Sequence, residues 1–384
     1  MPLSFTIDHL KNTTAIKTAL KQLNDGINPS LVDMPEAIRP LLAAIAAMDH
    51  GGTTLVLASR RDRADQVVGA LREYLPSEAS LERWVSPDAL PWEQLPVDLD
   101  ASVERTRNLA QFGFKLKHPR IVVAPIQALM QLIMSPEELR AHSLNLKVGE
   151  QIRMEEIFAW AGRVGYQTVP MVQESGTIAR RGGIIDIYPP GFENPIRIDF
   201  FGDEIDSIRY FSIHNQRSTG KLNRIKLLPP MELPIWELPT IASKLSALNT
   251  DTLRPEVRSE WERMVEHMAE GVVPASIDLF SGYLVPNRST LLDHLPRRTL
   301  VVIDQPGSMD LALDQVQQQA DELERTFVDS GELLPNLAKP YSDATTIREK
   351  LGHFPTLMLG ESVAAAEEHV HALHVPLQFR LERT

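Results

Sequence analysis

Three runs of continuous apolar residues limit most strongly what this chain can fold into. They are Thr54–Ala58, Arg120–Ala124 and Thr299–Ile303. A strand that is apolar along most of its length has to be buried on both faces, which is typical of a parallel sheet covered by helices on both sides. Apolar residues with helical spacing flank and separate these runs, at 34–48, 62–74, 102–115, 252–269 and 310–327. The sequence therefore predicts an α/β fold with a parallel sheet.

The middle of the chain has a different pattern. After an amphipathic helix predicted at Met154–Val164, short strands alternate with turn dipeptides such as Pro190-Gly191 and Gly202-Asp203. The predicted strands are Gln167–Val172, Gly182–Tyr188, Pro195–Phe201 and Asp206–Phe211. We therefore predict a small α+β domain inserted into the α/β domain. The predicted divisions are 1–142 for the first part of the α/β domain, 143–229 for the insertion, 230–360 for the second part, and 361–384 for the start of a truncated linker or further domain.

Composition narrows the class of protein. The 384 residues carry 51 acidic and 39 basic side chains, a net charge of −12, so the overall field repels a polyanion. The absence of cysteine excludes disulfides and thiol chemistry. No apolar run reaches the roughly 18 residues of a membrane span, and the first residues lack the pattern of a signal peptide. These features predict a cytoplasmic protein with no membrane partner, and they weigh against DNA as its main partner.

The most informative segment runs from Arg180 to Phe201. Because side chains alternate across a strand, Ile196 and Ile198 share one face of the predicted strand, whereas Arg197 and Phe201 share the other. A phenylalanine on the polar face of a strand, beside an arginine, is typical of a protein interaction hot spot. Alternatively, a second layer covers that face and makes Phe201 an ordinary core residue. The residues alone favour neither alternative.

Two adjoining runs carry a family resemblance. The run RRGGIIDIYPPG at 180–191, followed by NPIRIDFFGDEIDSIRYF at 194–211, resembles the second domain of the transcription-repair coupling factor family (Mfd), which is similar to the second domain of the excision nuclease subunit UvrB. The loop at 86–93 with Arg105, and the strand end Ala124-Pro125, resemble the first domain of the family. The resemblance covers 50–230 well and 230–350 loosely. It implies a degenerate P-loop (UvrB/RecA-like) parallel-sheet domain, split in sequence by an inserted UvrA-binding domain.

The resemblance also implies a partner and contact residues. In that family the second domain binds UvrA, and recruits this excision repair protein to RNA polymerase stalled at DNA lesions. The contact residues carried over by motif are Arg181, Arg197 and Phe201. Arg180 is an additional candidate, although a solvated strand end is its more ordinary interpretation. The family places its polymerase-binding domain and ATP-driven DNA translocase, with ATP and Mg, in further C-terminal domains, one of which masks the docking face. This chain would reach RNA polymerase and DNA only through those domains.

A missing motif bears on enzymatic activity. A nucleotide site in this fold needs a glycine-rich loop whose N–H groups surround phosphate and a lysine that reaches it. The expected position, Leu31–Pro40, reads LVDMPEAIRP, without glycine or lysine, and no GxxxxGK[ST] occurs in the chain. We therefore predict that this chain is not an enzyme and binds no cofactor. One alternative is a divergent UvrB-like, nucleotide-dependent DNA damage-binding subunit. The loop at 86–103 weighs against it, because its only aromatic residue is Trp92 whereas UvrB has a tyrosine-rich hairpin there. Another is an unrelated α/β domain that presents a β-rich interaction module.

Two polar clusters could suggest metal ligands, the acidic residues within 199–206 and the histidines within 367–374. Neither has a second set of ligands at useful spacing. We interpret the acidic side chains as a solvated turn and strand edge, and His369, His371 and His374 as the polar end of a helix. No metal site is predicted.

Overall fold

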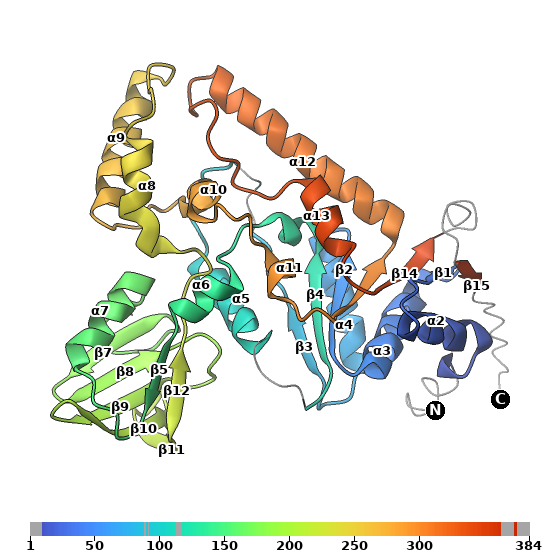
Figure 1. Cartoon of the computed structure of the whole chain (residues 1–384), viewed down its shortest axis with the longest axis horizontal. Helices are drawn as coiled ribbons and strands as arrows, with labels where there is room; N and C mark the ends of the chain where they lie inside the picture. The colour runs from blue at the N-terminus through green and yellow to red at the C-terminus, as the bar shows by residue number, and fades with distance from the viewer. Residues whose placement is uncertain (1–9, 88–89, 91, 113–116, 362–371, 375–384) are drawn as a thin grey trace.

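The fold contains two main sheets (Figure 1). The computed structural model describes residues 10–87, 90, 92–112, 117–361 and 372–374. A seven-stranded sheet has the order β15-β1-β14-β13-β2-β4-β3, and all its strand pairs are parallel. A separate six-stranded sheet has the order β11-β10-β9-β8-β7-β6. The predicted α/β class with a parallel sheet is confirmed, and a small β-rich part lies apart from that sheet.

The parallel sheet is built on the three apolar runs, which form its central strands β2, β4 and β13. Its strands are β1 (Ser30–Val32), β2 (Thr53–Ala58), β3 (Ser80–Arg83), β4 (Arg120–Pro125), β13 (Leu300–Asp304), β14 (Thr356–Glu361) and β15 (Ala372–His374). Every residue of β2, β4 and β13 is buried. Leu55 and Leu57 face one hydrophobic cluster and Val56 and Ala58 face another, because successive side chains point to opposite faces of the sheet. Both faces are therefore covered.

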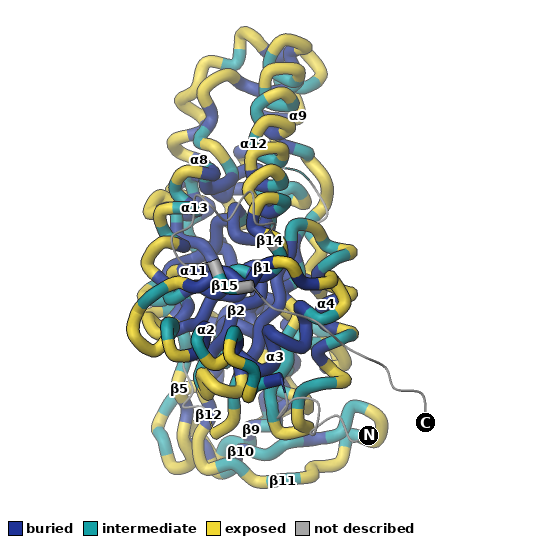
Figure 2. Tube along the Cα trace, turned by 90° about the vertical axis from the view of Figure 1, so that its right-hand side faces the viewer, coloured by how far each residue is buried: buried dark blue, intermediate teal, exposed yellow. Residues whose placement is uncertain are grey.

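Helices supply those two layers. One face is covered by α3 and α4, with α2 beside them, and the cluster on the other face includes side chains of α8, α9, α12 and α13. The helices with eight or more residues outside the small part are α2 (Thr14–Asn24), α3 (Arg39–His50), α4 (Arg61–Tyr74), α5 (Leu99–Phe112), α8 (Leu238–Leu245), α9 (Pro255–Ala269), α12 (Pro306–Asp329) and α13 (Ala344–Leu351). Shorter helices are η1 (Glu36–Ile38), η2 (Ile126–Met130), α6 (Pro136–Ala141), η3 (Ile235–Glu237), η4 (Ile277–Phe280), α10 (Ser281–Leu284) and α11 (Leu291–His294). The buried core lies around β1 and β2, whereas α9 and α12 extend above it with exposed outer faces (Figure 2). No helix in the described part of the chain is long and apolar enough to cross a membrane.

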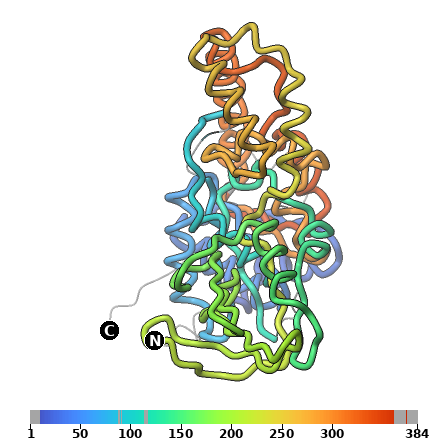
Figure 3. Tube along the Cα trace, turned by 90° about the vertical axis from the view of Figure 1, so that its left-hand side faces the viewer, coloured from blue at the N-terminus to red at the C-terminus, as the bar shows by residue number. Residues whose placement is uncertain are grey.

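The small part combines the six-stranded sheet with one helix and a two-stranded antiparallel sheet. Its elements are β5 (Leu144–Lys147), α7 (Met154–Val164), β6 (Gln167–Thr168), β7 (Thr177–Arg181), β8 (Ile184–Tyr188), β9 (Ile196–Phe201), β10 (Glu204–Phe211), β11 (Ser218–Leu222) and β12 (Arg224–Leu227). Isoleucines on one face of the sheet pack against α7, β5 and β12 in a cluster of their own. In Figure 3 these green strands occupy the lower part of the molecule.

Three details of the predicted secondary structure are wrong. Strand β7 was not predicted, so Arg181 lies at the end of β7 and not at the start of the next strand. The strand predicted at 167–172 ends at Thr168, shortly before Pro170, which has no N–H to donate to a sheet. His374 lies in β15 and not at a helix end. His369 and His371 lie outside the described residues.

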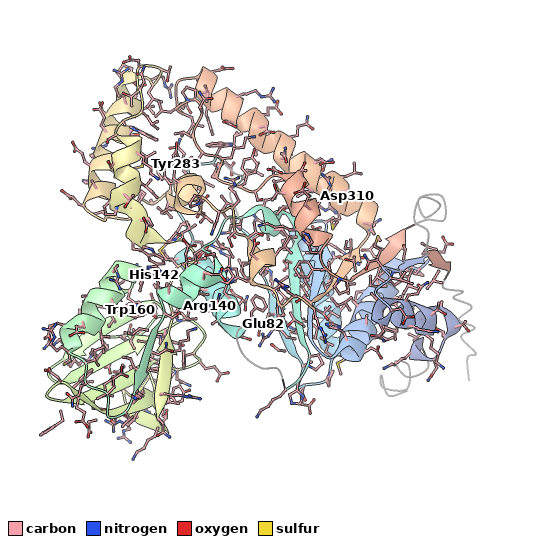
Figure 4. The ribbon with its side chains drawn as sticks, viewed as in Figure 1. Glu82, Arg140, His142, Trp160, Tyr283 and Asp310 are labelled. Atoms are coloured by element: carbon pink, nitrogen blue, oxygen red, sulfur yellow. The ribbon has the colours of Figure 1, made fainter. Side chains whose placement is uncertain are left out.

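Aromatic side chains hold the small part against the rest of the molecule. The His142 and Trp236 rings stack with centroids 3.8 Å apart, and Trp160 Nε1 donates to the His142 carbonyl at 2.9 Å. Figure 4 shows His142 and Trp160 close together at this junction. The Tyr166 hydroxyl donates to the Leu228 carbonyl at 2.7 Å. The predicted division points at 143 and 229 fall at this junction, although the division itself stays a prediction.

Candidate docking surface

The second face of the six-stranded sheet is covered in part by a small cluster of Val172, Ala179 and Phe211 and is exposed around Phe201. We call it the outer face, opposite the face that packs on α7. Cross-strand register places Asp186, Arg197, Arg209 and Lys221 in one row across β8, β9, β10 and β11. Directly opposite residues have their side chains on the same face. The outer face therefore carries a row of charged side chains, one from each of these four strands.

Phe201 ends β9 on this outer face. Its side chain is 84% exposed, whereas Ile196 and Ile198 on the inner face are fully buried, as strand parity predicts. A two-residue turn with Gly202 at φ 63° follows at once and leads into β10. Phe201 is therefore not a core residue, and the alternative in which a second layer covers it is wrong.

The Arg197 guanidinium is fixed in place by hydrogen bonds to neighbouring residues. Its Nε and Nη2 donate to the two carboxylate oxygens of Asp186 at 2.7 and 2.8 Å, and Nη1 donates to the Gln216 carbonyl at 3.1 Å. The guanidinium lies 4.6 Å from the Phe211 ring centroid, and the side chain is 15% exposed. The hydrogen bonds to Asp186 raise the pKa of Arg197 above its ordinary value. Asp186 therefore orients the Arg197 guanidinium, and little of the side chain is exposed to solvent.

The structure separates the two arginines at the end of β7. Arg181 lies opposite Ile184, which in turn lies opposite Asp199, so Arg181 is on the outer face with Arg197 and Phe201. It is exposed and donates one long bond to the Pro170 carbonyl at 3.4 Å. Arg180 points to the other face, where Nη1 donates to Glu155 of α7 at 2.9 Å. Three of the four predicted contact residues therefore share one face, and Arg180 does not.

Sequence reasoning missed two further residues on the outer face, Ile184 and Arg209. Both fall in strands that were predicted, so parity could have assigned each to a face. Which face they share with Phe201 depends on cross-strand register, however, and register is set by the turns between strands. Arg209 Nη2 binds Asp199 Oδ2 at 2.5 Å, and Ser207 Oγ donates to the same oxygen at 2.7 Å.

The acidic residues near Phe201 are engaged with protein groups. Asp199 binds Arg209, and Glu204 accepts from Gln151 Nε2 at 3.0 Å. Within the residues that the structure describes, no three histidine or carboxylate side chains come together in a way that could hold a metal ion.

The position expected for a phosphate loop contains a network of ion pairs. Arg39 Nη1 lies 3.2 Å and Arg63 Nε 2.5 Å from the two carboxylate oxygens of Asp304, and Arg63 Nη1 lies 2.5 Å from Glu36. Arg39 begins α3, and Asp304 ends β13. A side chain at Gly360 would come within 2.5 Å of Arg39 Nε, so the guanidinium lies directly against that glycine. Here the carboxyl edge of the parallel sheet is filled by the protein's own charged groups.

A second buried ion pair binds the backbone at Val85. Arg105 of α5 binds Glu232 with Nε at 2.7 Å and donates to the Val85 carbonyl at 3.3 Å. Ser102 donates to the same glutamate. The Arg105 and Glu232 side chains are each 2% exposed. Arg105, which carried part of the family resemblance, therefore has a structural role in this chain.

Comparisons with known proteins bear on the six-stranded sheet and on the chain as a whole. Residues 144–233 match the UvrB interaction domain family, and this range contains the whole six-stranded sheet. The chain is also similar to proteins named transcription-repair-coupling factor. It is 28% identical to that of Haemophilus influenzae over 327 residues, 84% of this chain, and 28% identical to that of Escherichia coli over 293 residues, 74% of this chain. The predicted resemblance is confirmed. The chain spans about a quarter of the length of these relatives, 28% and 24% respectively.

Proposed function

We propose that this chain docks UvrA through the outer face of its six-stranded sheet, and so acts as the UvrA-recruiting part of a transcription-repair coupling factor. The observation that carries the proposal is Phe201, a large aromatic side chain 84% exposed at the end of β9. It lies in the domain that matches the UvrB interaction domain family. Exposed aromatic residues with arginines beside them dominate the affinity of many protein interfaces.

Each predicted contact residue has a distinct part in the proposed docking. The Phe201 ring enters an apolar recess of UvrA and supplies most of the affinity. Arg181 pairs with a carboxylate and fixes the register of the complex. Arg197, whose donors are mostly used by Asp186 and Gln216, presents its remaining edge in a fixed orientation, which lowers the entropy cost of binding.

We further propose that the chain itself neither binds nor hydrolyses ATP. The carboxyl ends of β1 and β13 would have to accept the phosphates, but Arg39 and Arg63 already neutralise Asp304 there. Phosphate binding would also need backbone N–H groups in a glycine-rich loop, and Leu31–Pro40 has no glycine. In this proposal ATP, Mg, DNA and RNA polymerase are handled by further domains of the parent protein, one of which masks the docking face.

The test is a binding measurement with purified UvrA. We expect UvrA to bind the wild-type chain and to bind Phe201→Ala with an affinity lower by about 2 kcal/mol, roughly thirtyfold. Leu311→Ala is the matched control, because Leu311 is also an exposed apolar side chain, 65% exposed on α12. A wild-type chain that leaves UvrA unbound would refute the docking proposal.

The rival function, a nucleotide-dependent damage-binding subunit, predicts a different result. Calorimetry of the chain with Mg-ATP should then give a dissociation constant on the order of micromolar. We expect no heat of binding, and a clear micromolar isotherm would overturn our account of the carboxyl edge.

A further inference from the structure

An apolar side chain diagonal to Phe201 lies outside the hydrophobic clusters of the described residues. Ile184, the first residue of β8, is only partly buried and belongs to none of the hydrophobic clusters. It lies between Arg181 and Asp199 on the outer face. Phe201 is two residues beyond Asp199 on β9, so Ile184 and Phe201 are diagonal neighbours, a spacing that aromatic side chains can bridge.

The turn between β7 and β8 leaves this corner open. It consists of Gly182 and Gly183, and a side chain added at Gly182 would meet no atom within 4 Å. Gly182 has φ 59°, as a two-residue hairpin turn requires. The turn therefore adds no side chain beside Ile184, and a Cβ-sized group has room at Gly182.

Arg209 differs from its neighbour Arg197 in how much of it a partner can reach. The two lie directly opposite each other on β9 and β10. Arg209 is 33% exposed against 15% for Arg197, and among the described residues it forms a salt bridge with Asp199, itself 19% exposed. A partly exposed ion pair contributes little to stability, so Arg209 can exchange Asp199 for another carboxylate at small cost.

We propose that Ile184 and Arg209 complete the docking surface around Phe201. UvrA would present a single apolar recess that receives the Phe201 ring and the Ile184 side chain, and a carboxylate at the edge of the recess that pairs with Arg209. This inference rests on the proposed function and adds two contact residues and the chemistry of the complementary site. The burial of an apolar pair and the pairing of a guanidinium with a carboxylate are the interactions that interface centres favour.

The experiment measures the affinity of purified UvrA for four single variants of the full chain. Ile184→Thr keeps a β-branched residue in the strand, and Arg209→Gln keeps a polar side chain of similar length. We expect each to weaken UvrA binding at least fivefold. Leu311→Thr and Arg180→Gln are the matched controls, on α12 and on the opposite face of the same sheet, and should change the affinity less than twofold.

Urea unfolding of each variant shows whether the sheet remains intact. If Arg209→Gln lowers stability, association rates at low and high salt provide a second measurement, because loss of a contacting charge reduces the salt dependence of association. Wild-type affinity for UvrA in both variants, together with lost affinity in Phe201→Ala, would overturn this inference and leave the proposed function standing. Failure of the wild-type chain to bind would remove the proposed function itself.

Discussion

Two networks of arginine and carboxylate groups differ in what surrounds them. The carboxyl-edge network consists of Glu36, Arg39, Arg63 and Asp304 at the end of the parallel sheet. The outer-face network consists of Asp186, Arg197, Asp199 and Arg209 on the six-stranded sheet. Arg39 and Asp304 are 9% and 5% exposed, whereas Arg209 and Asp199 are 33% and 19% exposed. The Arg39–Asp304 pair therefore lies deeper than the Arg209–Asp199 pair, although Glu36 of the first network is 59% exposed and Asp186 of the second is 2% exposed.

Ion pairs of the same chemical groups fill the carboxyl edge of the parallel sheet and, in the proposed function, provide contacts on the outer face of the six-stranded sheet. Buried charges are costly unless they are paired, so the carboxyl-edge network holds its members in place and leaves no free charge for a ligand. Partly exposed pairs are weakly held, so the Arg209–Asp199 pair can rearrange when a partner arrives, whereas Arg197 stays bound to Asp186. Exposure thus separates a structural ion pair from one suited to docking.

Removal of Asp304 should have the largest effect. In Asp304→Ala, Arg39 and Arg63 lose their shared carboxylate and two positive charges are left close together. We expect the free energy of unfolding to fall by about 3–5 kcal/mol, as for other broken buried ion pairs. Urea unfolding monitored by circular dichroism measures the loss.

The control for this variant is the corresponding change in the exposed network. Asp199→Ala should cost at most about 1 kcal/mol, since Arg209 can turn to solvent. If the two variants lost equal stability, the distinction between the two networks would be wrong.

The carboxyl group of Asp278 forms no salt bridge with an arginine in the described part of the chain. Asp278 lines a cavity of about 790 Å³ beside the Arg105–Glu232 pair. Burial, together with the smaller effect of the Glu232 charge, raises the pKa of Asp278 from 3.8 to about 6, against the opposing effect of Arg105. Because the folded state holds this proton more tightly than the unfolded chain, its contribution to stability is fully present below the unfolded pKa. It is lost as the pH rises through about 6.

Asp278→Asn removes this titration. The variant should therefore be more stable than wild type above the folded pKa by up to about 3 kcal/mol, and the difference should disappear near pH 4. Urea unfolding across this range checks the sign. A variant that is less stable than wild type at high pH would show that the carboxylate is favourably paired.

The Arg197 guanidinium tests the outer-face network at the less exposed of its two arginines. In Arg197→Lys the positive charge remains, but an ammonium group cannot make the two parallel bonds to Asp186 while also reaching the Gln216 carbonyl. We expect a loss of about 1.5 kcal/mol in unfolding free energy, and a weaker UvrA complex if Arg197 acts by its fixed orientation. Arg209→Lys is the control, because its single partner can be met by an ammonium group. Unchanged UvrA affinity in Arg197→Lys would show that charge alone is needed at this position.

The sequence predicted the parallel sheet because burial on both faces leaves a local signal. Thr54–Ala58 and Arg120–Ala124 are apolar along most of their length, and they form β2 and β4. The short strand β1 has no such length, and β7 ends in Ala-Arg-Arg, so neither was predicted. Strands that lie at an edge or carry polar residues depend on their neighbours for stability, and those neighbours are distant in the sequence.

The candidate site was predictable only within a single strand. Parity along β9 placed Arg197 and Phe201 on one face correctly, and the exposure of Phe201 agrees with an interaction site. The roles proposed for Ile184 and Arg209 depend on the register between β8, β9 and β10. The bonds that hold Arg197 depend on Asp186, which lies in another strand. The sequence pattern contains neither fact, because both arise from pairing across strands.

Arg180 should give the smallest effect, and it tests whether the face of the sheet decides function. It is adjacent to Arg181 in sequence, but its guanidinium pairs with Glu155 on the opposite face. This pair is exposed on both sides, so Arg180→Ala should change the free energy of unfolding by less than about 0.5 kcal/mol and leave UvrA affinity unchanged. Arg181→Ala removes the same charge one residue away and should weaken UvrA binding severalfold. Equal losses of affinity in the two variants would mean that net positive charge near the turn, and not the outer face, attracts the partner.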